Sequence, residues 1–216
     1  MEVKHKGWNW NEVNSSSWNQ ISEEFFPIAY NWKNKFQSIL DIGAGKGRHA
    51  FFFAENGFEV GAIDLSESGI EYIKNVANEK KLNVNAVVAD MTNLPFEDNR
   101  FDCVICFHTI YHTDYNGVKK ALQEIRRVLK NGGEAFISFN SKENPNYVES
   151  ESPDGFTIIK DEGGEKGIPH CYLNEYDLFD ILSDFKIISM NKIQNYVRKG
   201  RDARGIHFYV HISAEK

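Results

Sequence analysis

Residues 38–49 constrain this chain more than any other stretch, because they join an apolar run to a glycine-rich loop. The apolar run contains a single acid, Asp41, and predicts a buried strand. Three glycines at alternate positions follow it, and the apolar pattern of residues 50–54 predicts a helix directly behind them. Glycines let a ligand lie against bare main chain, and a helix N-terminus directs N–H groups and the positive end of its dipole into the same space. The stretch therefore predicts a pocket for a nucleotide or nucleoside.

The spacing of the glycines distinguishes two kinds of nucleotide loop. A dinucleotide fingerprint needs G-x-G-x-x-G, and Arg48 occupies the last of those positions. The observed form is Gly43-x-Gly45-x-Gly47, preceded by Asp41. It resembles motif I of the class I S-adenosylmethionine (SAM) methyltransferases. The resemblance implies a Rossmann-like α/β fold and SAM as cofactor, with S-adenosylhomocysteine as its product.

Composition limits the classes of function. The length of 216 residues suits one domain, and no apolar run approaches the roughly 20 residues of a membrane span. The formal net charge of −6 argues against nucleic acid, whose binding proteins usually carry a basic surface. Three cysteines suggest no disulfide framework, and Cys103 and Cys106 fall within an apolar strand pattern that predicts core packing. We expect a cytoplasmic protein, either monomer or homodimer, without a membrane or nucleic-acid partner.

A second strand is predicted over residues 58–63 and ends at Asp64. Asp64 lies roughly 20 residues after the first loop glycine, where a strand-end acid can accept hydrogen bonds from both ribose hydroxyls. Leu65 beside it is placed to press on the adenine face. Capping a helix is the alternative role for Asp64, but Ser66 already suits the N-cap of the helix predicted over residues 67–80.

A third strand over residues 84–89 places Asp90 at the same edge of the sheet. The resemblance implies that Asp90 takes the adenine amino group and that the backbone N–H of Met91 reaches the ring. The linker over residues 94–102 resembles that of the methyltransferases closely. A fourth strand over residues 101–107 follows, and its end lacks the Asn/Asp-Pro-Pro-Tyr/Phe of enzymes that methylate base amines.

The remaining pattern completes an α/β domain. A helix over residues 117–129 is stopped by Asn131-Gly132-Gly133, and residues 134–139 form the next strand. Residues 155–160 and 167–171 are predicted to pair as a hairpin within a substrate-side insertion, 141–172. A helix over 175–183 and strands near 185–195 and 206–213 follow. We predict a seven-stranded, mostly parallel sheet with helices on both faces and a C-terminal antiparallel strand pair.

The N-terminal 36 residues are rich in aromatic side chains and predict a helical cap. Polar residues 14–17 offer N-caps for a helix in which Trp18, Ile21, Phe25 and Ile28 recur at helical spacing. The cap either packs on the edge of the sheet or closes as a lid over the bound molecules. The domain assignment is therefore one methyltransferase domain over residues 1–216, with this cap at its start.

The resemblance also implies which residues bind the cofactor. Asp41 orients the loop or reaches the cofactor's amino group through water, while the other predicted contacts with the methionine part come from main chain. These are Gly43, Ala44, Gly45 and Lys46 along the methionine part, with Cys106 and Phe107 at the end of the fourth strand. Within the family, the chain looks most like the type 11 and tellurite-resistance-type branch that acts on small molecules, through residues 45–50, 165–170 and 207–212.

The predicted activity is transfer of a methyl group from SAM to a small soluble acceptor. His112 and His170 are candidate general bases, and His108 is a third candidate, because histidine titrates near neutral pH. A metal site is the alternative use of these residues, formed by His108, His112, His170, His207 and His211, but no ligand motif supports it, and we predict no metal. Two further functions are compatible with the sequence: a Rossmann-type NAD-dependent oxidoreductase and a SAM-binding module without catalysis.

Overall fold

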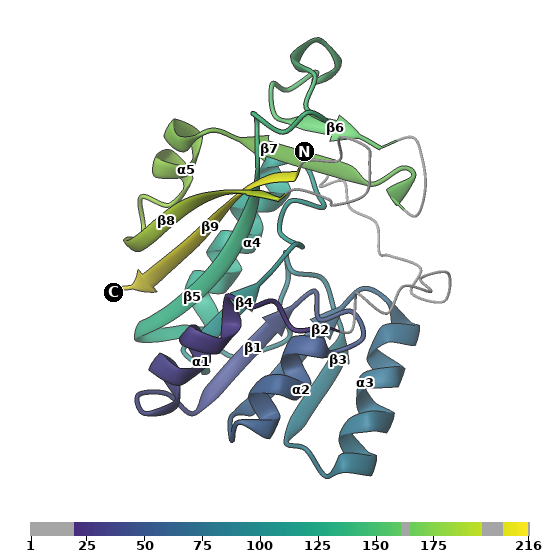
Figure 1. The fold of residues 1–216 in the computed structure, drawn as a ribbon, viewed down its shortest axis with the longest axis vertical. Helices are drawn as coiled ribbons and strands as arrows, with labels where there is room; N and C mark the ends of the chain where they lie inside the picture. The colour runs from purple at the N-terminus through teal and green to yellow at the C-terminus, as the bar shows by residue number, and fades with distance from the viewer. Residues whose placement is uncertain (1–19, 161–164, 196–204, 216) are drawn as a thin grey trace.

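Alternating apolar strands and amphipathic helices fold into an α/β structure around one sheet, shown in Figure 1 by a computed structural model. It describes residues 20–160, 165–195 and 205–215. The helices are α1 (Phe25–Lys33), α2 (Arg48–Glu55), α3 (Glu67–Lys80), α4 (Tyr115–Val128) and α5 (Glu175–Ile181), and Glu149–Glu151 forms a short 3-10 helix. The strands are β1 (Ser38–Ile42), β2 (Glu59–Asp64), β3 (Val84–Val88), β4 (Phe101–Cys106), β5 (Leu129–Ser141), β6 (Thr157–Ile159), β7 (Pro169–Leu173), β8 (Lys186–Asn195) and β9 (Gly205–Ala214).

The sheet has the predicted mostly parallel character. Strands β3, β2, β1, β4 and β5 lie side by side in that order and all run parallel. Strand β9 pairs antiparallel with β5 along residues 133–140, and β8 pairs antiparallel with β9. These seven strands confirm the predicted sheet and its C-terminal antiparallel pair. Strands β6 and β7 bring the sheet to nine strands, because β7 joins the end of β5 at residues 140–141.

Helices cover both faces of the sheet, and each face has its own core. Figure 1 shows α1, α2 and α3 in front of the sheet and α4 behind it. On β1 the two faces alternate: Ile39 packs in the core with α1, α2 and α3, whereas Leu40 packs in the core with α4 and α5. Both side chains are fully buried. This burial on both faces explains why β1 is mostly apolar.

The helix predicted at the N-terminus begins later than expected. The residues predicted to cap it, 14–17, lie outside the described residues, as does Trp18. Residues 20–24 form turns and irregular chain, and α1 begins only at Phe25, without a side-chain cap. The helical spacing of Ile21 therefore predicted a longer helix than the structure has. Burial of Phe25 and Trp32 against α2 and the sheet determines the position of α1.

Strand β5 also differs from the prediction. The turn expected at Asn131-Gly132-Gly133 does not separate α4 from the strand, because β5 begins at Leu129 directly after the helix. Gly132 has a positive φ of 74°, and the pairing of β4 with β5 shifts register between Phe101 and Cys103. The glycines therefore form an irregularity inside the strand, where the prediction placed a connection.

The predicted hairpin of the insertion is confirmed. Strands β6 and β7 pair antiparallel, with Ile158 opposite His170, and they lie at the top of Figure 1. The backbone N–H of Gly167 donates a 2.7 Å hydrogen bond to the carbonyl of Lys160, which closes the hairpin on either side of residues 161–164. These four residues lie outside the described part of the chain.

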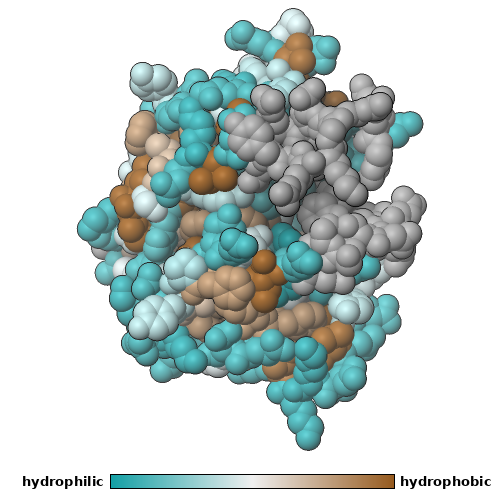
Figure 2. Space-filling model, in the orientation of Figure 1, coloured by the Kyte–Doolittle hydropathy of each residue, from teal (hydrophilic) through white to brown (hydrophobic). Residues whose placement is uncertain are grey.

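The surface of one face of the molecule combines polar and hydrophobic areas. Figure 2 shows hydrophobic residues gathered on the left and across the lower middle of this face, with hydrophilic residues around them. Across residues 20–160, 165–195 and 205–215, none of the helices combines the length and the apolar character that spanning a membrane requires. Cys103, Cys106 and Cys171 are buried free thiols, as expected for core residues.

Candidate functional site

The glycine loop follows β1 directly and ends at α2. Gly43, Gly45 and Gly47 all have positive φ, and Gly47 is the N-cap residue of α2. At Gly43 the requirement is also steric, because a Cβ built there would lie 2.2 Å from the Thr109 side chain. The turn after β4 therefore packs closely on the start of the glycine loop. Ala44 is buried beside it, and Lys46 is half-buried.

Asp64 at the end of β2 holds the glycine loop in place. One carboxylate oxygen accepts a 2.8 Å hydrogen bond from the backbone N–H of Gly45, and the other accepts one of 2.8 Å from that of Ser66. The alternative role as a helix cap is filled by Ser66, whose hydroxyl accepts a hydrogen bond from the backbone N–H of Gly69. Burial raises the pKa of Asp64, while these backbone hydrogen bonds oppose the rise. Asp64 thus connects the ends of β1 and β2 at the edge where a ligand would lie.

Asp41 lies within β1, almost completely buried. Its Oδ2 has no hydrogen-bond partner in the described structure. Burial raises its pKa to about 7, the positive charge of Arg48 opposes this rise, and the negative charge of Asp64 adds to it. A buried carboxylate oxygen without a partner is costly, so this atom fits a polar or cationic group of a ligand in the loop.

The predicted adenine-side residues differ in exposure. Leu65 is 37% exposed, unusually high for a leucine beside a buried strand, whereas Met91 is buried. The Asp90 carboxylate accepts hydrogen bonds from the backbone N–H and the hydroxyl of Thr92, at 2.8 and 2.9 Å. Leu65 and Asp90 follow adjacent strands, β2 and β3. The topology therefore places the predicted adenine contacts along one edge of the sheet.

The turn after β4 carries the first of the predicted histidines. Cys106 and Phe107 are buried at the end of the strand. His108 has a positive φ of 55°, and its backbone N–H donates a 2.6 Å hydrogen bond to the Ser138 hydroxyl on β5. Its Nδ1 lies 3.1 Å from the Tyr111 hydroxyl. Burial lowers the pKa of His108 to about 3, with His207 contributing, so the ring is neutral.

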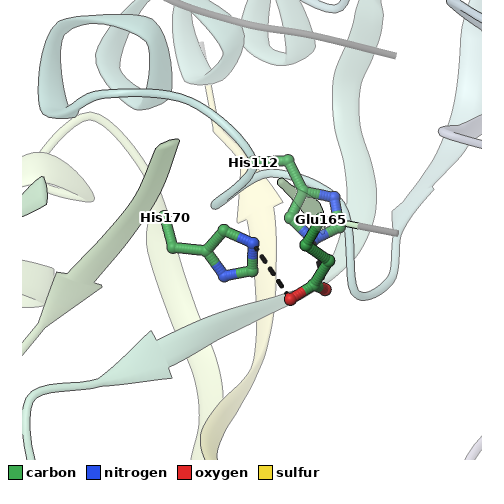
Figure 3. A group of neighbouring side chains, drawn as sticks. All are labelled: His112, Glu165 and His170. Carbon is green, nitrogen blue, oxygen red and sulfur yellow. Dashed lines mark ion pairs between the residues drawn. The ribbon is translucent and has the colours of Figure 1, made fainter. Parts of the chain in front are cut away.

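The two histidines proposed as general bases lie side by side. The ring centroids of His112 and His170 are 4.8 Å apart, although the residues are far apart in sequence. Burial lowers the pKa of His112 to about 4 and that of His170 to about 2. Figure 3 shows the Glu165 carboxylate aimed at the His170 ring, and its two oxygens lie 3.6 Å from His170 Nε2 and 3.9 Å from His112 Nε2.

Sequence reasoning missed two features of this region. Glu165 was not a candidate, because an acid in a polar, glycine-rich segment carries no signal until the hairpin folds. Tyr111 was not singled out either, yet its buried ring contacts His112, His170 and His207. His211 does not join this group, because it lies further along β9, opposite Phe136, and its Nε2 is 2.8 Å from Glu134 on β5.

Comparison with known proteins agrees with the fold. Residues 39–133 match the family model described as a methyltransferase domain. An uncharacterised protein of Methanocaldococcus jannaschii is 34% identical over 155 residues, which are 64% of each chain. An uncharacterised methyltransferase of Bacillus subtilis is 35% identical over 96 residues, 44% of this chain and 37% of that one. A ubiquinone biosynthesis O-methyltransferase of Coxiella burnetii is 31% identical over 104 residues, 48% of this chain and 44% of that one. The chain thus spans less than two thirds of the length of each of these relatives.

Solved structures show the same fold at lower sequence identity. A protein of Pyrococcus horikoshii has a TM-score of 0.74 at 23% identity, covering 94% of both chains. TehB of Haemophilus influenzae has a TM-score of 0.68 at 16% identity, covering 95% of this chain and 65% of its own. The 1,6-didemethyltoxoflavin-N1-methyltransferase of Burkholderia thailandensis, solved with S-adenosylhomocysteine, has a TM-score of 0.66 at 19% identity, covering 93% and 82%. Residues 39–133 therefore match a methyltransferase domain, and the chain shares the fold of structures solved for SAM-dependent methyltransferases.

Proposed function

We propose that this protein transfers the methyl group of SAM to a small soluble acceptor. The observation that carries the proposal is the buried Asp41 carboxylate, whose Oδ2 has no partner within the described residues and lies next to the glycine loop. A cofactor with a charged amino group would supply the missing partner. The matched methyltransferase domain and the relative solved with S-adenosylhomocysteine support the choice of cofactor.

The remaining cofactor contacts follow from the strand ends. Gly43, Ala44, Gly45 and Lys46 would offer main chain to the methionine part, and Cys106 and Phe107 would do so from β4. Asp64 already accepts two backbone hydrogen bonds, and each carboxylate oxygen keeps a lone pair for a ribose hydroxyl. Leu65, Asp90 and Met91 would hold the adenine.

SAM supplies a methyl group activated by a sulfonium, so the protein mainly positions the acceptor in line with it. The acceptor side would be formed by His108, His112 and His170. His112 and His170 are the candidates to take a proton from an acceptor that must lose one, and because burial lowers both pKa values, each ring is a weak base in the ligand-free protein. The absence of the Pro-Pro-Tyr/Phe motif and the net charge of −6 support a small molecule over nucleic acid.

The names of the relatives support the same substrate class. Among them are an O-methyltransferase of ubiquinone biosynthesis and an N-methyltransferase of a toxoflavin precursor. They differ in the atom that is methylated, so they indicate the class and not the individual acceptor. The tellurite-resistance-type assignment rests on short phrases and on the fold shared with TehB. We place the enzyme in the cytoplasm, as a monomer or homodimer.

Calorimetry with three ligands tests this proposal. We expect SAM and S-adenosylhomocysteine to bind and NAD(H) not to bind. Release of S-adenosylhomocysteine with a panel of phenolic, carboxylic and heterocyclic acceptors then tests catalysis. SAM binding without turnover on any acceptor would favour the SAM-binding module, and tight NAD binding without SAM binding would refute the assignment. Robust methylation of bulk RNA or DNA would refute the small-molecule acceptor.

A further inference from the structure

Three potential metal ligands converge beside the turn after β4. One ligand atom each from His112, Glu165 and His170 lies within 4.8 Å of the others (Figure 3). The Glu165 oxygens are 3.9 and 3.6 Å from the two Nε2 atoms, longer than a hydrogen bond. Zinc ligands at about 2.0–2.1 Å from the ion in tetrahedral geometry are about 3.3 Å apart. The ligand atoms, now 3.6 to at most 4.8 Å apart, would therefore need to approach one another by at most about 1.5 Å to hold an ion.

The backbone holds this arrangement from both sides. The N–H of Cys171 donates a 2.9 Å hydrogen bond to the carbonyl of Tyr111, which places His170 on β7 beside His112. The N–H of His112 donates a 2.8 Å hydrogen bond to the carbonyl of Thr109. The N–H of Ile168 donates one of 2.9 Å to the carbonyl of Glu165, at the start of β7's hairpin. Main-chain hydrogen bonds thus hold the segments that carry the three proposed ligands.

The electrostatics of the cluster also suit a cation. His170 is 4% exposed, and its Nε2 faces Glu165 without a hydrogen-bond partner in the described chain. Two imidazoles and one carboxylate thus face one another, and this is a set of donors that a divalent ion can share. The Glu165 side chain is 34% exposed, which leaves an entry path from solvent.

We propose that His112, Glu165 and His170 form a binding site for a divalent transition-metal ion. Two imidazoles and one carboxylate are a ligand set that suits zinc, iron, cobalt, nickel or manganese, whereas magnesium and calcium prefer oxygen ligands alone. The sequence predicted no metal, because no two of these ligands lie at a recognisable motif spacing. Only the hairpin and the turn after β4 bring them together.

The position of the site indicates that the ion binds the methyl acceptor, and this part of the inference rests on the proposed function. His112 lies three residues after Thr109, which packs against Gly43 of the glycine loop. Three protein ligands leave coordination positions open for another molecule. The acceptor class is therefore a small molecule with an oxygen or nitrogen donor that binds the ion. Ligation through Nε2 occupies the nitrogen that would otherwise take a proton, so it replaces the general-base role of both histidines.

Metal binding can be measured without any turnover. Protein without a polyhistidine tag is stripped with chelator, dialysed against Zn²⁺ and analysed by mass spectrometry for bound metal. Titration with Co²⁺, followed by visible absorption, reports the ligand set. We expect one ion per chain, no thiolate charge-transfer band, and at least tenfold weaker binding in Glu165→Gln and in His170→Ala. Glu165→Gln is the decisive variant, because the half-exposed amide replaces the acid without loss of volume.

His211→Gln is the matched control, because His211 is also paired with a glutamate, Glu134, but lies outside the cluster. It should bind metal as the unaltered protein does. Binding at no defined stoichiometry, or binding that Glu165→Gln leaves unchanged, would overturn the site. Calorimetry with S-adenosylhomocysteine on the same samples separates the two proposals. Metal binding without cofactor binding would refute the proposed function and leave the metal site standing, and the reverse result would refute the metal site alone.

Discussion

The backbone N–H of Cys171 donates a 2.9 Å hydrogen bond to the carbonyl oxygen of Tyr111. This contact joins the insertion hairpin to the turn after β4, although Tyr111 and Cys171 are 60 positions apart in the sequence. His112 directly follows Tyr111, and His170 directly precedes Cys171. The hydrogen bond therefore brings the two histidines together. The same turn touches the glycine loop through Thr109 and Gly43. The proposed cofactor side and the proposed acceptor side therefore lie on one connected set of segments.

Replacing Asp64 should weaken cofactor binding strongly. Asp64→Ala removes the predicted ribose hydrogen bonds, and each hydrogen bond to an ionised group contributes about 1.5–3 kcal/mol. It also removes the acceptor for the N–H of Gly45, so the loop is less well held. Calorimetry should show affinity for S-adenosylhomocysteine reduced by about two orders of magnitude or more, and Asp64→Asn should lose less. Asp98→Asn, at an exposed acid paired with Arg127, is the control and should bind normally. Equal affinities in all these proteins would place the pocket elsewhere.

Cofactor affinity should depend on pH through Asp41. Its pKa in the folded, ligand-free protein is raised to about 7, chiefly by burial. If the ionised carboxylate binds a cationic amino group, affinity falls as pH drops below about 7, by up to tenfold per pH unit. Calorimetry at a series of pH values should show this fall, and Asp41→Asn should bind weakly with a flat profile over the same range.

Asp41 should also affect the stability of the ligand-free protein, which we expect to fall as pH rises while cofactor affinity increases. An acid whose folded pKa lies above its unfolded value destabilises the fold as pH rises from about 4, and the cost is complete above about 7. Asp41→Asn should therefore make the ligand-free protein more stable at pH 8, by at most about 4 kcal/mol. The gain should shrink as pH falls toward 4. Urea denaturation at several pH values measures it, and a loss of stability at pH 8 would contradict the prediction.

Comparison of Gly43 with Gly57, which both have positive φ, separates the steric cost of a side chain in the glycine loop from its conformational cost. Gly57 has a φ of 94°, and a Cβ there would meet no atom of the described chain within 4 Å. Gly57→Ala should cost only the conformational penalty, about 1–2 kcal/mol. Gly43→Ala adds a contact of 2.2 Å with Thr109 and should cost about 1–3 kcal/mol more. Urea denaturation of the two variants tests this, and equal losses would show that Thr109 moves aside freely.

Asp102 should stabilise the fold until strongly acidic pH. Partial burial alone would raise its pKa, but hydrogen bonds from Lys130 and from Ser38 and Gln37 together lower it to about 2. Its contribution is therefore fully present above about pH 4 and is lost as pH falls toward 2. Asp102→Asn should lower the free energy of unfolding by about 1–2 kcal/mol at pH 7, after allowance for solvent screening. The difference from the unaltered protein should vanish near pH 2, and a constant difference across that range would refute the assignment.

The sequence by itself determined the central sheet and the edge at which its strand-end acids lie. Ser66 was identified as an N-cap from its position before a helical pattern, and its hydroxyl caps α3 as predicted. Strand-end acids such as Asp64 could be placed because parallel strands present their carboxyl ends at one edge. These features depend on neighbouring residues and on a fixed strand direction, so the local sequence carries them.

Tertiary structure decided the rest. The start of α1 was missed because burial of Phe25 and Trp32, and not a local cap, determines where that helix begins. The partner of His112 and His170 was missed because Glu165 reaches them only when the hairpin folds onto the turn after β4. The unpartnered Oδ2 of Asp41 likewise results from burial on every side. Contacts between distant segments depend on long-range packing, and no spacing within a segment encodes them.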